Sequence, residues 1–453
     1  MGSLQWIMAA AALLLAGCGG GSDGPPAPPA TRPTIVEFSV DSATLLMGDR
    51  AQLTPVFGGG SGRIVPDIGP VRSGVTVSTP ALEGDATYRL IVEADGAPTA
   101  TRVLSLSVNH RDRYVAAGSF ESEHHAAVEL PDGSVLVVGG SRGASVLSNS
   151  IDLFDPATRT FRQVGEMATG RAWARPVVLA DGRVLIAGGS TTIAAGVTYE
   201  LIDVQAGRVS PAGTPVRNRV GHTATRLLDG RVLIAGGFED STAEIWDPAT
   251  GGARPVAARM SNPREWHTAT LLADGRVLLV GGFTMAPAYW LAEVFDPRTE
   301  QFTPLGAPRL APRNEALGLH TAQRLADGTV LIAGGEHFIA NVDRTARPTA
   351  DVLRFDPLTG AFTPETSLLA PRTLLAAAKL ADDRVLLLGG LGADGAPAAT
   401  GELYRAGRDR TATASLEVAR VHHTVSRLPG GRLLVLGGEA PNGSLVPSVL
   451  IYE

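Results

Sequence analysis

Residues 222–237 read HTATRLLDGRVLIAGG, and this stretch recurs with small changes along most of the chain. Each copy is a short apolar run, a turn that is usually Asp-Gly, and a second apolar run that ends in two glycines. The other copies occupy residues 125–140, 174–189, 267–282, 320–335, 375–390 and 423–438. Successive double glycines are 45 to 55 residues apart, a spacing that is typical of repeat architectures.

Each unit predicts four antiparallel strands. Asp-Gly between two apolar runs is a hairpin signal, and we expect a type I′ turn, in which both central residues have positive φ. A third strand follows and usually ends in Asp-Pro, as in residues 244–248 (EIWDP), and a fourth comes after that turn, as in residues 302–305 (FTPL). Four antiparallel strands repeated radially are the plan of a β-propeller blade.

The units resemble kelch repeats in three features. A double glycine ends the second strand, an aromatic residue lies near the end of the third, and Arg-x-x-His leads the first. The resemblance covers roughly residues 112–453 and implies an all-β, seven-bladed kelch-type propeller, similar to the central domain of galactose oxidase. The last unit ends at residues 450–453 (LIYE) without a fourth strand. We therefore expect the strand at residues 113–118 (RYVAAG) to close a propeller that spans residues 110–453, which removes an open sheet edge.

The first 18 residues predict a lipoprotein signal peptide. The apolar run at residues 8–16 is too short to span a bilayer, and it leads into Leu15-Ala16-Gly17-Cys18, which resembles a bacterial lipoprotein box. This resemblance implies lipidation of Cys18 and anchoring to the bacterial cell envelope, and Gly19 suggests the outer membrane. Cys18 is the only cysteine, so a disulfide within the chain is excluded.

Two segments that differ in composition from the repeats precede them. Residues 19–33 are rich in glycine and proline and predict a linker. Residues 34–109 contain short strand-like runs separated by turn signals, and they resemble the Ig-like β-sandwich modules of bacterial envelope proteins. The chain carries 39 basic and 45 acidic residues with no basic run, so we expect no nucleic-acid partner, and we expect a monomer.

The connections of the predicted ring vary on one face only. Seven residues always separate the histidine position from the hairpin turn, whereas the second glycine precedes the third-strand aromatic by 9 residues at Gly237–Trp246 and by 20 at Gly335–Phe355. Variable loops on a rigid scaffold mark the face where binding usually occurs. We expect the loops at 303–319 and 336–350 to form a lip over a central pocket there.

Arginines and glutamates are the candidate ligand-binding residues on that face. Arginine presents a forked donor that matches carboxylates, so the arginines favour an anion or sugar site, and the alternative is a salt bridge or a carbonyl contact. The candidates are Arg171, Arg219, Arg264, Arg313, Glu336, His337, Arg372, Arg420 and Glu439. The histidines at 125, 222, 267, 320 and 423 are expected to pack between blades, and no metal site is predicted from them because the symmetry spreads them around the ring.

The residues favour binding over catalysis. The resemblance to galactose oxidase would imply a copper radical made from a tyrosine crosslinked to a cysteine, and the chain has no cysteine besides Cys18. We predict no catalytic residue and no cofactor. The expected function is that of a non-catalytic envelope lipoprotein, which binds a glycan or a protein partner on the variable face. The alternatives are an enzyme similar to sialic acid mutarotase, which is a kelch propeller, and a structural envelope scaffold.

Overall fold

The structure is a computed structural model that describes residues 32–42, 45–82, 85–109, 111–142, 146–191, 198–284, 292–306, 316–339, 343–380, 382–405, 407 and 410–453. The residues predicted to form a signal peptide, Cys18, most of the predicted linker and Arg313 lie outside these ranges. The regular structure described is β-strand, apart from one 3₁₀ turn at Pro429–Gly431, so the all-β fold class is confirmed. The described part of the chain holds no helix with the length and hydropathy that crossing a bilayer demands.

The chain divides into two compact units, and the N-terminal one contains two sheets. One sheet has the order β1 (Thr34–Val40), β3 (Gln52–Gly58), β6 (Val77–Ser78). The other has the order β5 (Gly69–Val71), β4 (Ser61–Val65), β7 (Ala86–Glu93), β8 (Ala100–Leu106). Alternate residues of β7 are buried, as expected for strands with one face in a core. Two short strands that group with the second unit, β2 (Leu45–Leu46) and β9 (Val108–Asn109), pair in parallel.

The second unit contains seven four-stranded antiparallel sheets in its described residues, numbered here 1 to 7 in chain order. Sheets 1 to 3 are β11 (Ala126–Glu129), β12 (Val135–Val138), β13 (Ser150–Asp155), β14 (Thr160–Glu166); β15 (Arg175–Val178), β16 (Val184–Ala187), β17 (Glu200–Asp203), β18 (Arg208–Pro211); and β19 (Thr223–Arg226), β20 (Val232–Ala235), β21 (Ala243–Asp247), β22 (Gly252–Pro255). Sheets 4 and 5 are β23 (Thr268–Leu271), β24 (Val277–Val280), β25 (Ala292–Asp296), β26 (Gln301–Pro304); and β28 (Thr321–Arg324), β29 (Val330–Ala333), β32 (Val352–Asp356), β33 (Ala361–Pro364). Sheets 6 and 7 are β35 (Ala376–Lys379), β36 (Val385–Leu388), β38 (Gly401–Tyr404), β39 (Arg410–Ala412); and β40 (Thr424–Arg427), β41 (Leu433–Leu436), β42 (Ser448–Tyr452), β10 (Tyr114–Ser119).

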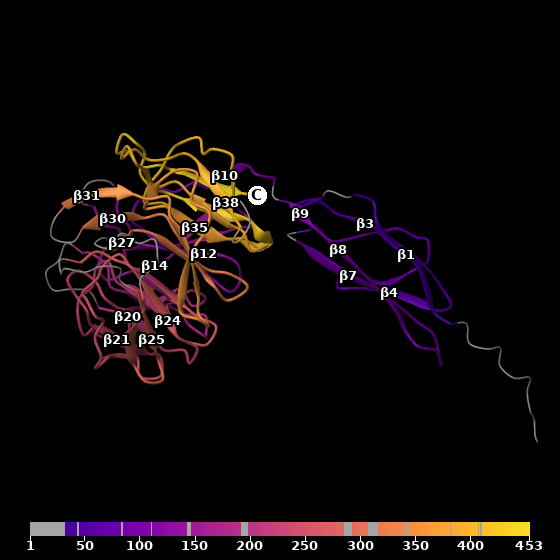
Figure 1. Cartoon of the computed structure of the whole chain (residues 1–453), viewed down its shortest axis with the longest axis horizontal. Coiled ribbons are helices and arrows are strands. Elements are labelled where there is room, and N and C mark those ends of the chain that lie inside the picture. Colours follow the sequence, from indigo (N-terminus) through magenta and orange to yellow (C-terminus); the bar gives the residue numbers. More distant parts are fainter. Residues whose placement is uncertain are drawn as a thin grey trace, which may run out of the picture. The chain divides into compact units, whose positions relative to one another are not determined.

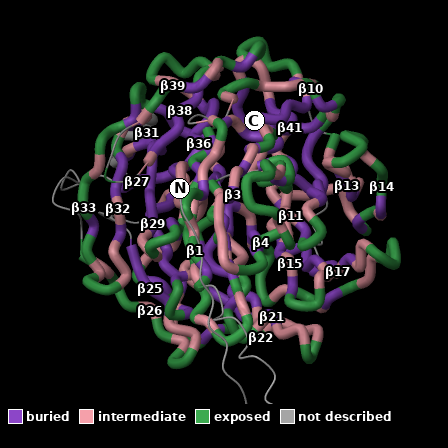
Figure 2. The backbone as a smooth tube through the Cα atoms, turned by 90° about the vertical axis from the view of Figure 1, so that its right-hand side faces the viewer, coloured by how far each residue is buried: buried purple, intermediate pink, exposed green. Residues whose placement is uncertain are grey.

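These sheets are arranged as in a β-propeller. The first strands of the seven sheets contact one another in a closed order, from β11 through β15, β19, β23, β28 and β35 to β40 and back to β11. The second strand of every sheet is a four-residue apolar run that is fully buried, because neighbouring sheets cover both of its faces. Exposed turns lie at the rim and buried strands lie inside it (Figure 2).

The ring is sealed by strands from its two ends. β10 runs antiparallel to β42, with Tyr114 opposite Tyr452 and Ala116 opposite Leu450. The C-terminus accordingly lies beside β10 (Figure 1). This is the strand pairing that the sequence led us to expect. Sheet 7 packs against sheet 1 through an apolar cluster that includes Ile451 of β42 and Val137 of β12.

The Asp-Gly hairpin turns are not of type I′, so that prediction was wrong. In sheet 1, Gly133 has a φ of 85°, but Asp132 does not have positive φ. The N–H of Leu130 donates to the oxygen of Ser134 at 2.9 Å, which makes a three-residue loop with a glycine in the left-handed region. The Asp132 carboxylate accepts the N–H of Ser134, two residues later, at 3.0 Å. The carboxylates of the aspartates at 181, 229, 274 and 327 likewise accept the N–H of the residue two positions later. This side-chain hydrogen bond favours the observed turn.

The segments expected as a lip of loops contain a sheet of their own. β27 (Ala316–Gly318), β30 (Glu336–Ile339) and β31 (Asp343–Pro348) form three antiparallel strands in the order β27-β30-β31. A second small pair joins β34 (Arg372–Thr373) to β37 (Leu391–Gly392). The variable face is therefore partly built from paired backbone and not from open loops.

Candidate functional site

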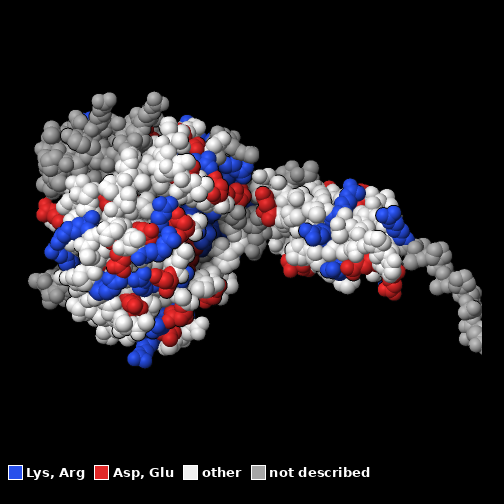
Figure 3. Space-filling model, turned by 60° about the horizontal axis from the view of Figure 1, so that its bottom comes forward, with Lys and Arg blue, Asp and Glu red and all other residues white. Residues whose placement is uncertain are grey.

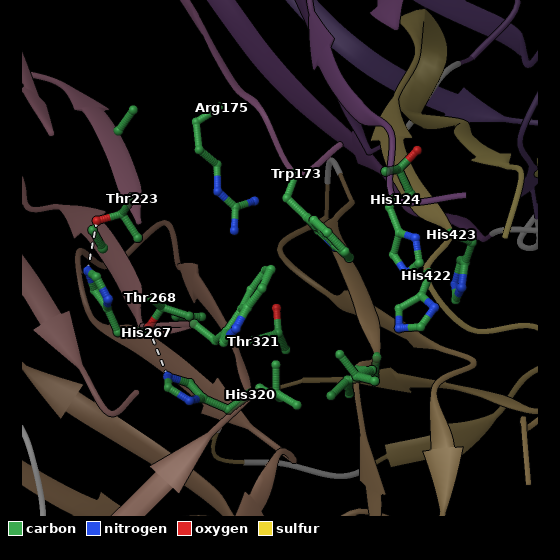
Figure 4. Close-up of a pocket in the computed structure, with 18 of the residues that line it drawn as sticks. His124, Trp173, Arg175, Thr223, His267, Thr268, His320, Thr321, His422 and His423 are labelled. Carbon is green, nitrogen blue, oxygen red and sulfur yellow. Dashed lines mark hydrogen bonds between the residues drawn. The ribbon is translucent and has the colours of Figure 1, made fainter. Parts of the chain in front are cut away.

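A pocket of ≈ 440 Å³ lies where the first strands of the sheets begin, at the centre of the ring. Its lining comes from the first strands of the sheets and the residues just before them, from all seven units of the ring, and includes Trp173, Arg175 and Trp266. The side chains of His124, His422 and Trp173 are turned toward one another at one side of it (Figure 4). The pocket opens on the face that carries the variable connections, because each first strand runs from this face to its hairpin turn.

The same backbone conformation recurs around the mouth of the pocket. The residue two positions before each first strand has positive φ, and six of these seven residues have side chains that line the pocket. They are His124 (54°), Trp173 (54°), Gly221 (71°), Trp266 (55°), Leu319 (50°), Leu374 (56°) and His422 (57°). Positive φ is costly for bulky residues and needs support from the surroundings. Support comes from hydrogen bonds between neighbours, such as Trp173 N–H to His124 oxygen at 2.9 Å.

Four aromatic rings form an arc along this mouth. The ring centres of His422 and His124 are 4.1 Å apart, those of His124 and Trp173 are 4.5 Å apart, and those of Trp173 and Trp266 are 5.8 Å apart. Such an arc offers flat apolar faces to a ligand in the pocket.

Arg175 is the cation of the pocket. Its Nε donates to the backbone oxygen of His222 at 3.0 Å, and no carboxylate of the described residues lies within ion-pair distance of it. Burial lowers the pKa of the Arg175 guanidinium. The side chain extends into the open space between Thr223 and Trp173 (Figure 4). It can therefore offer its terminal N–H groups to a bound anion or hydroxyl.

Acidic groups flank the histidine side of the mouth. Burial raises the pKa of Glu123 to about 7, and the neighbouring carboxyl of Glu439 contributes through a hydrogen bond and through its charge. Burial, followed by the proximity of His422, lowers the pKa of His124 to about 4. Nδ1 of His124 is 3.9 Å from a Glu123 oxygen, and Nδ1 of His422 is 3.7 Å from a Glu439 oxygen.

The histidines one position further on lie between sheets, as the sequence analysis expected. Nε2 of His125, His267 and His320 each bonds a threonine hydroxyl of the adjacent sheet at 2.9 Å. The imidazoles lie close under the double glycines: a Cβ added at Gly437 would meet His125 Cε1 at 2.8 Å. Burial lowers the pKa of these histidines, so they are uncharged at neutral pH and fill the space between neighbouring sheets.

The arginines predicted as ligand-binding residues are inside the sheets. Five of them are 0 to 3% exposed, and four pair with a buried glutamate of the third strand in the same sheet. The pairs are Arg171–Glu200, Arg219–Glu244 (2.7 Å), Arg264–Glu293 (2.5 Å) and Arg372–Glu402 (3.3 Å). Arg420 instead donates to the oxygens of Gly437 and Ser448. We therefore replace the ligand-binding interpretation of these arginines with the alternative of salt bridges and carbonyl contacts.

The remaining candidates have mixed positions. Glu336 is buried on β30, and burial raises its pKa. Nε2 of His337 is paired with Asp351 at 2.9 Å. Glu439 is the one described candidate that the structure brings to the mouth, and Arg313 lies outside the described residues.

Sequence reasoning missed the residues that line the mouth, which are His124, Trp173, Arg175, Trp266 and His422. The repeats were aligned on the histidine position, and the lining side chains are its direct neighbours. Two signals were available: His-His occurs at 124/125 and again at 422/423, and tryptophan precedes that position in two other units.

Comparison with known proteins agrees with the geometry. The kelch motif matches residues 124–168. Among solved structures, a fungal alcohol oxidase "with catalytic diversity among the AA5 family, in complex with copper" shares the fold, with a TM-score of 0.60, 16% identity and 75% of each chain covered. No curated protein matches the chain. The all-β unit is therefore a propeller-type fold with a kelch motif, and an identity this low shows the fold alone.

A copper radical centre does not fit this site. In galactose oxidase such a centre needs a tyrosine crosslinked to a cysteine, but the residues described as lining the pocket include neither type. Of the described tyrosines in the second unit, Tyr199, Tyr404 and Tyr452 are buried in strands or next to them.

Proposed function

We propose that this chain is a carbohydrate-binding lipoprotein of the bacterial cell envelope. In this proposal residues 110–453 form a seven-bladed kelch propeller, residues 34–109 form an Ig-like module, and lipidated Cys18 anchors both to the outer membrane. The central pocket holds an acidic sugar. The observation that carries the proposal is Arg175, a half-buried cation that faces the pocket and has no carboxylate partner among the described residues.

The chemistry of the lining supports a sugar. Trp173 and Trp266 present ring faces on which the apolar face of a pyranose can stack. Thr223 and Thr268 add hydroxyls. A guanidinium recognises a carboxylate with paired hydrogen bonds, so Arg175 favours a uronic or sialic acid over a neutral sugar. The pocket volume of ≈ 440 Å³ lies within the usual range for small-molecule sites of about 300–1,000 Å³.

The face of the molecule shown in Figure 3 gives no support to a nucleic-acid partner. Basic and acidic side chains are interspersed over the face shown in Figure 3, without one continuous basic region on its described part. Nucleic-acid binding depends on a concentrated positive surface.

Titration calorimetry with neutral, uronic and sialic sugars tests the proposal. We expect an acidic sugar to bind the full chain, Arg175→Gln to remove its preference over the neutral sugar, and Trp173→Leu to weaken both. Leucine already occupies the equivalent positions 319 and 374, so the fold should tolerate Trp173→Leu. Arg254→Ala, at an exposed ion pair, is the matched control and should bind normally. Equal affinity for acidic and neutral sugars in the unmodified chain would overturn the role of Arg175. Faster anomer interconversion would favour the mutarotase alternative.

A further inference from the structure

The chain departs from its own repeat where sheets 7 and 1 meet. At the positive-φ position the other units carry tryptophan, glycine or leucine, but the two adjacent units carry His124 and His422. A glutamate directly precedes His124, and a second one, Glu439, follows the double glycine of sheet 7. Two imidazoles and two carboxyls therefore converge at one point of the mouth.

The donor atoms are spaced as in a loosely formed metal site. One side-chain donor atom each from Glu123, His124 and His422 lies within 4.8 Å of the other two. Ligands at about 2.0 Å from a tetrahedral ion are separated by about 3.3 Å, so a small inward rotation of the side chains would complete the geometry. Nδ1 of His422 lies 3.7 Å from a carboxylate oxygen of Glu439, so an ion would be bound through the other ring nitrogen, Nε2.

The backbone that carries these donors is held in place. Glu123 exchanges two hydrogen bonds with Ser141, at 3.0 and 2.8 Å, and Glu439 exchanges two with Val421, at 3.0 and 2.9 Å. The oxygen of His124 accepts the N–H of Trp173. Only side-chain rotation is then needed to bind an ion, which keeps the entropic cost of binding low.

We propose that Glu123, His124 and His422 bind a divalent transition-metal ion, with Zn²⁺ as the preferred ion. Two imidazoles and one carboxylate are ligands that zinc commonly takes when further coordination positions stay open. Imidazole selects against Mg²⁺ and Ca²⁺, which prefer oxygen ligands. Glu439 lies beside His422 as an outer partner that orients its ring. The open positions face the pocket, next to Trp173. This inference goes beyond sugar binding and does not depend on it.

Metal binding can be measured directly on the untagged full chain. We expect titration with Zn²⁺ alone to give one site per chain, and Co²⁺ to give the visible absorption of a low-symmetry complex. His124→Trp and His422→Leu place residues that other units carry at the same position, so both should fold. Each should weaken Zn²⁺ binding by more than about 100-fold, since even the loss of outer-shell partners costs about 10- to 100-fold.

Glu265→Gln is the matched control. Glu265 occupies in sheet 4 the position that Glu123 occupies in sheet 1, but Trp266 follows it instead of a histidine. Glu265→Gln should leave the affinity for zinc unchanged, whereas Glu123→Gln should reduce that affinity. The proposal is overturned if the unmodified chain binds no zinc, or if His124→Trp and His422→Leu bind it as well as the unmodified chain while their circular dichroism and melting stay native. Because no sugar is present in this titration, its failure leaves the carbohydrate proposal standing.

Discussion

Arg219 and Glu244 form an ion pair inside sheet 3, with 2.7 Å between Nε and Oε1 and with side chains that are 2% and 0% exposed. Arg219 also donates to the oxygen of Gly236 at 2.8 Å, so it links the third strand to the double glycine that ends the second. Sheets 2, 4 and 6 repeat the pair. Sheet 5 has leucine at both positions: Leu317 replaces the arginine, and Leu353 replaces the glutamate.

Breaking this pair should be costly. Arg219→Met leaves the Glu244 carboxylate buried without its cation, and we expect a loss of about 3–5 kcal/mol in the free energy of unfolding. Urea denaturation followed by tryptophan fluorescence measures it. Arg254→Ala, at the exposed pair with Glu300, should cost no more than about 1 kcal/mol. Equal losses in the two variants would contradict a special role for burial.

Arg420 provides a second test of the same idea. It is buried in sheet 7, where Leu450 occupies the position of the glutamate, and burial lowers its pKa to about 10. Arg420→Met removes the donor to the carbonyl oxygens of Gly437 and Ser448, but it leaves no buried carboxylate without its cation. We expect a smaller loss of stability than for Arg219→Met under the same urea conditions. A loss as large as that of Arg219→Met would show that the carbonyl contacts dominate.

The double glycines should not tolerate a side chain. Gly281 has a φ of 66°, and a Cβ there would lie 2.1 Å from the oxygen of Leu317 in the approach to sheet 5. Gly230, in a hairpin turn, has a φ of 90° with nothing within 4 Å. Gly230→Ala should cost about 1–2 kcal/mol from backbone strain alone. Gly281→Ala should cost clearly more, because two sheets must separate, and thermal melting of both variants would show the difference.

The inter-sheet histidines predict sensitivity to acid. Burial lowers the pKa of His222 and His423 to about 3 and that of His125 to about 4. An unfolded histidine titrates near about 6.5, so below that pH the unfolded chain binds more protons than the folded chain. Stability should be complete above this pH and should fall as the pH drops toward 4, by about 1.4 kcal/mol per pH unit for each histidine.

His222→Gln tests this pH dependence. Removing one titrating imidazole should reduce the slope of the unfolding free energy against pH, between pH 6.5 and 4, by about 1.4 kcal/mol per pH unit. The carboxylates contribute equally in both proteins, so the difference between their slopes isolates the histidine. Identical slopes would mean that His222 does not stay neutral in the folded state.

Much of the fold could be predicted from the sequence because it depends on local signals. The apolar runs and double glycines predict the second strands, and the closing strand follows from an unpaired unit at each end. The turn type was missed because Asp132 uses its side chain to bind the backbone, which a pattern of residue types does not reveal. The sheet of β27, β30 and β31 was missed because β27 pairs with β30 across the intervening hairpin of β28 and β29.

The site was less predictable because it depends on contacts across the ring. Arg264 pairs with Glu293 instead of facing a ligand, and strand pairing within sheet 4 brings the two together. His124 and His422 belong to the first and last units, and only closure of the ring places their imidazoles together. The positive φ of His124 has no signature in the sequence, since most residues there are not glycine.

The pairing of β10 with β42 also constrains the order in which the chain can mature. During synthesis β10 emerges before every other strand of the ring, yet the strand that it pairs with is made last. Until β42 has been made, Tyr114 to Ala116 lack the strand that they pair with, and sheet 1 lacks one flank. The nascent chain thus carries an open edge while all the other strands of the ring are made, and a chaperone that shields such edges would be needed longest at β10.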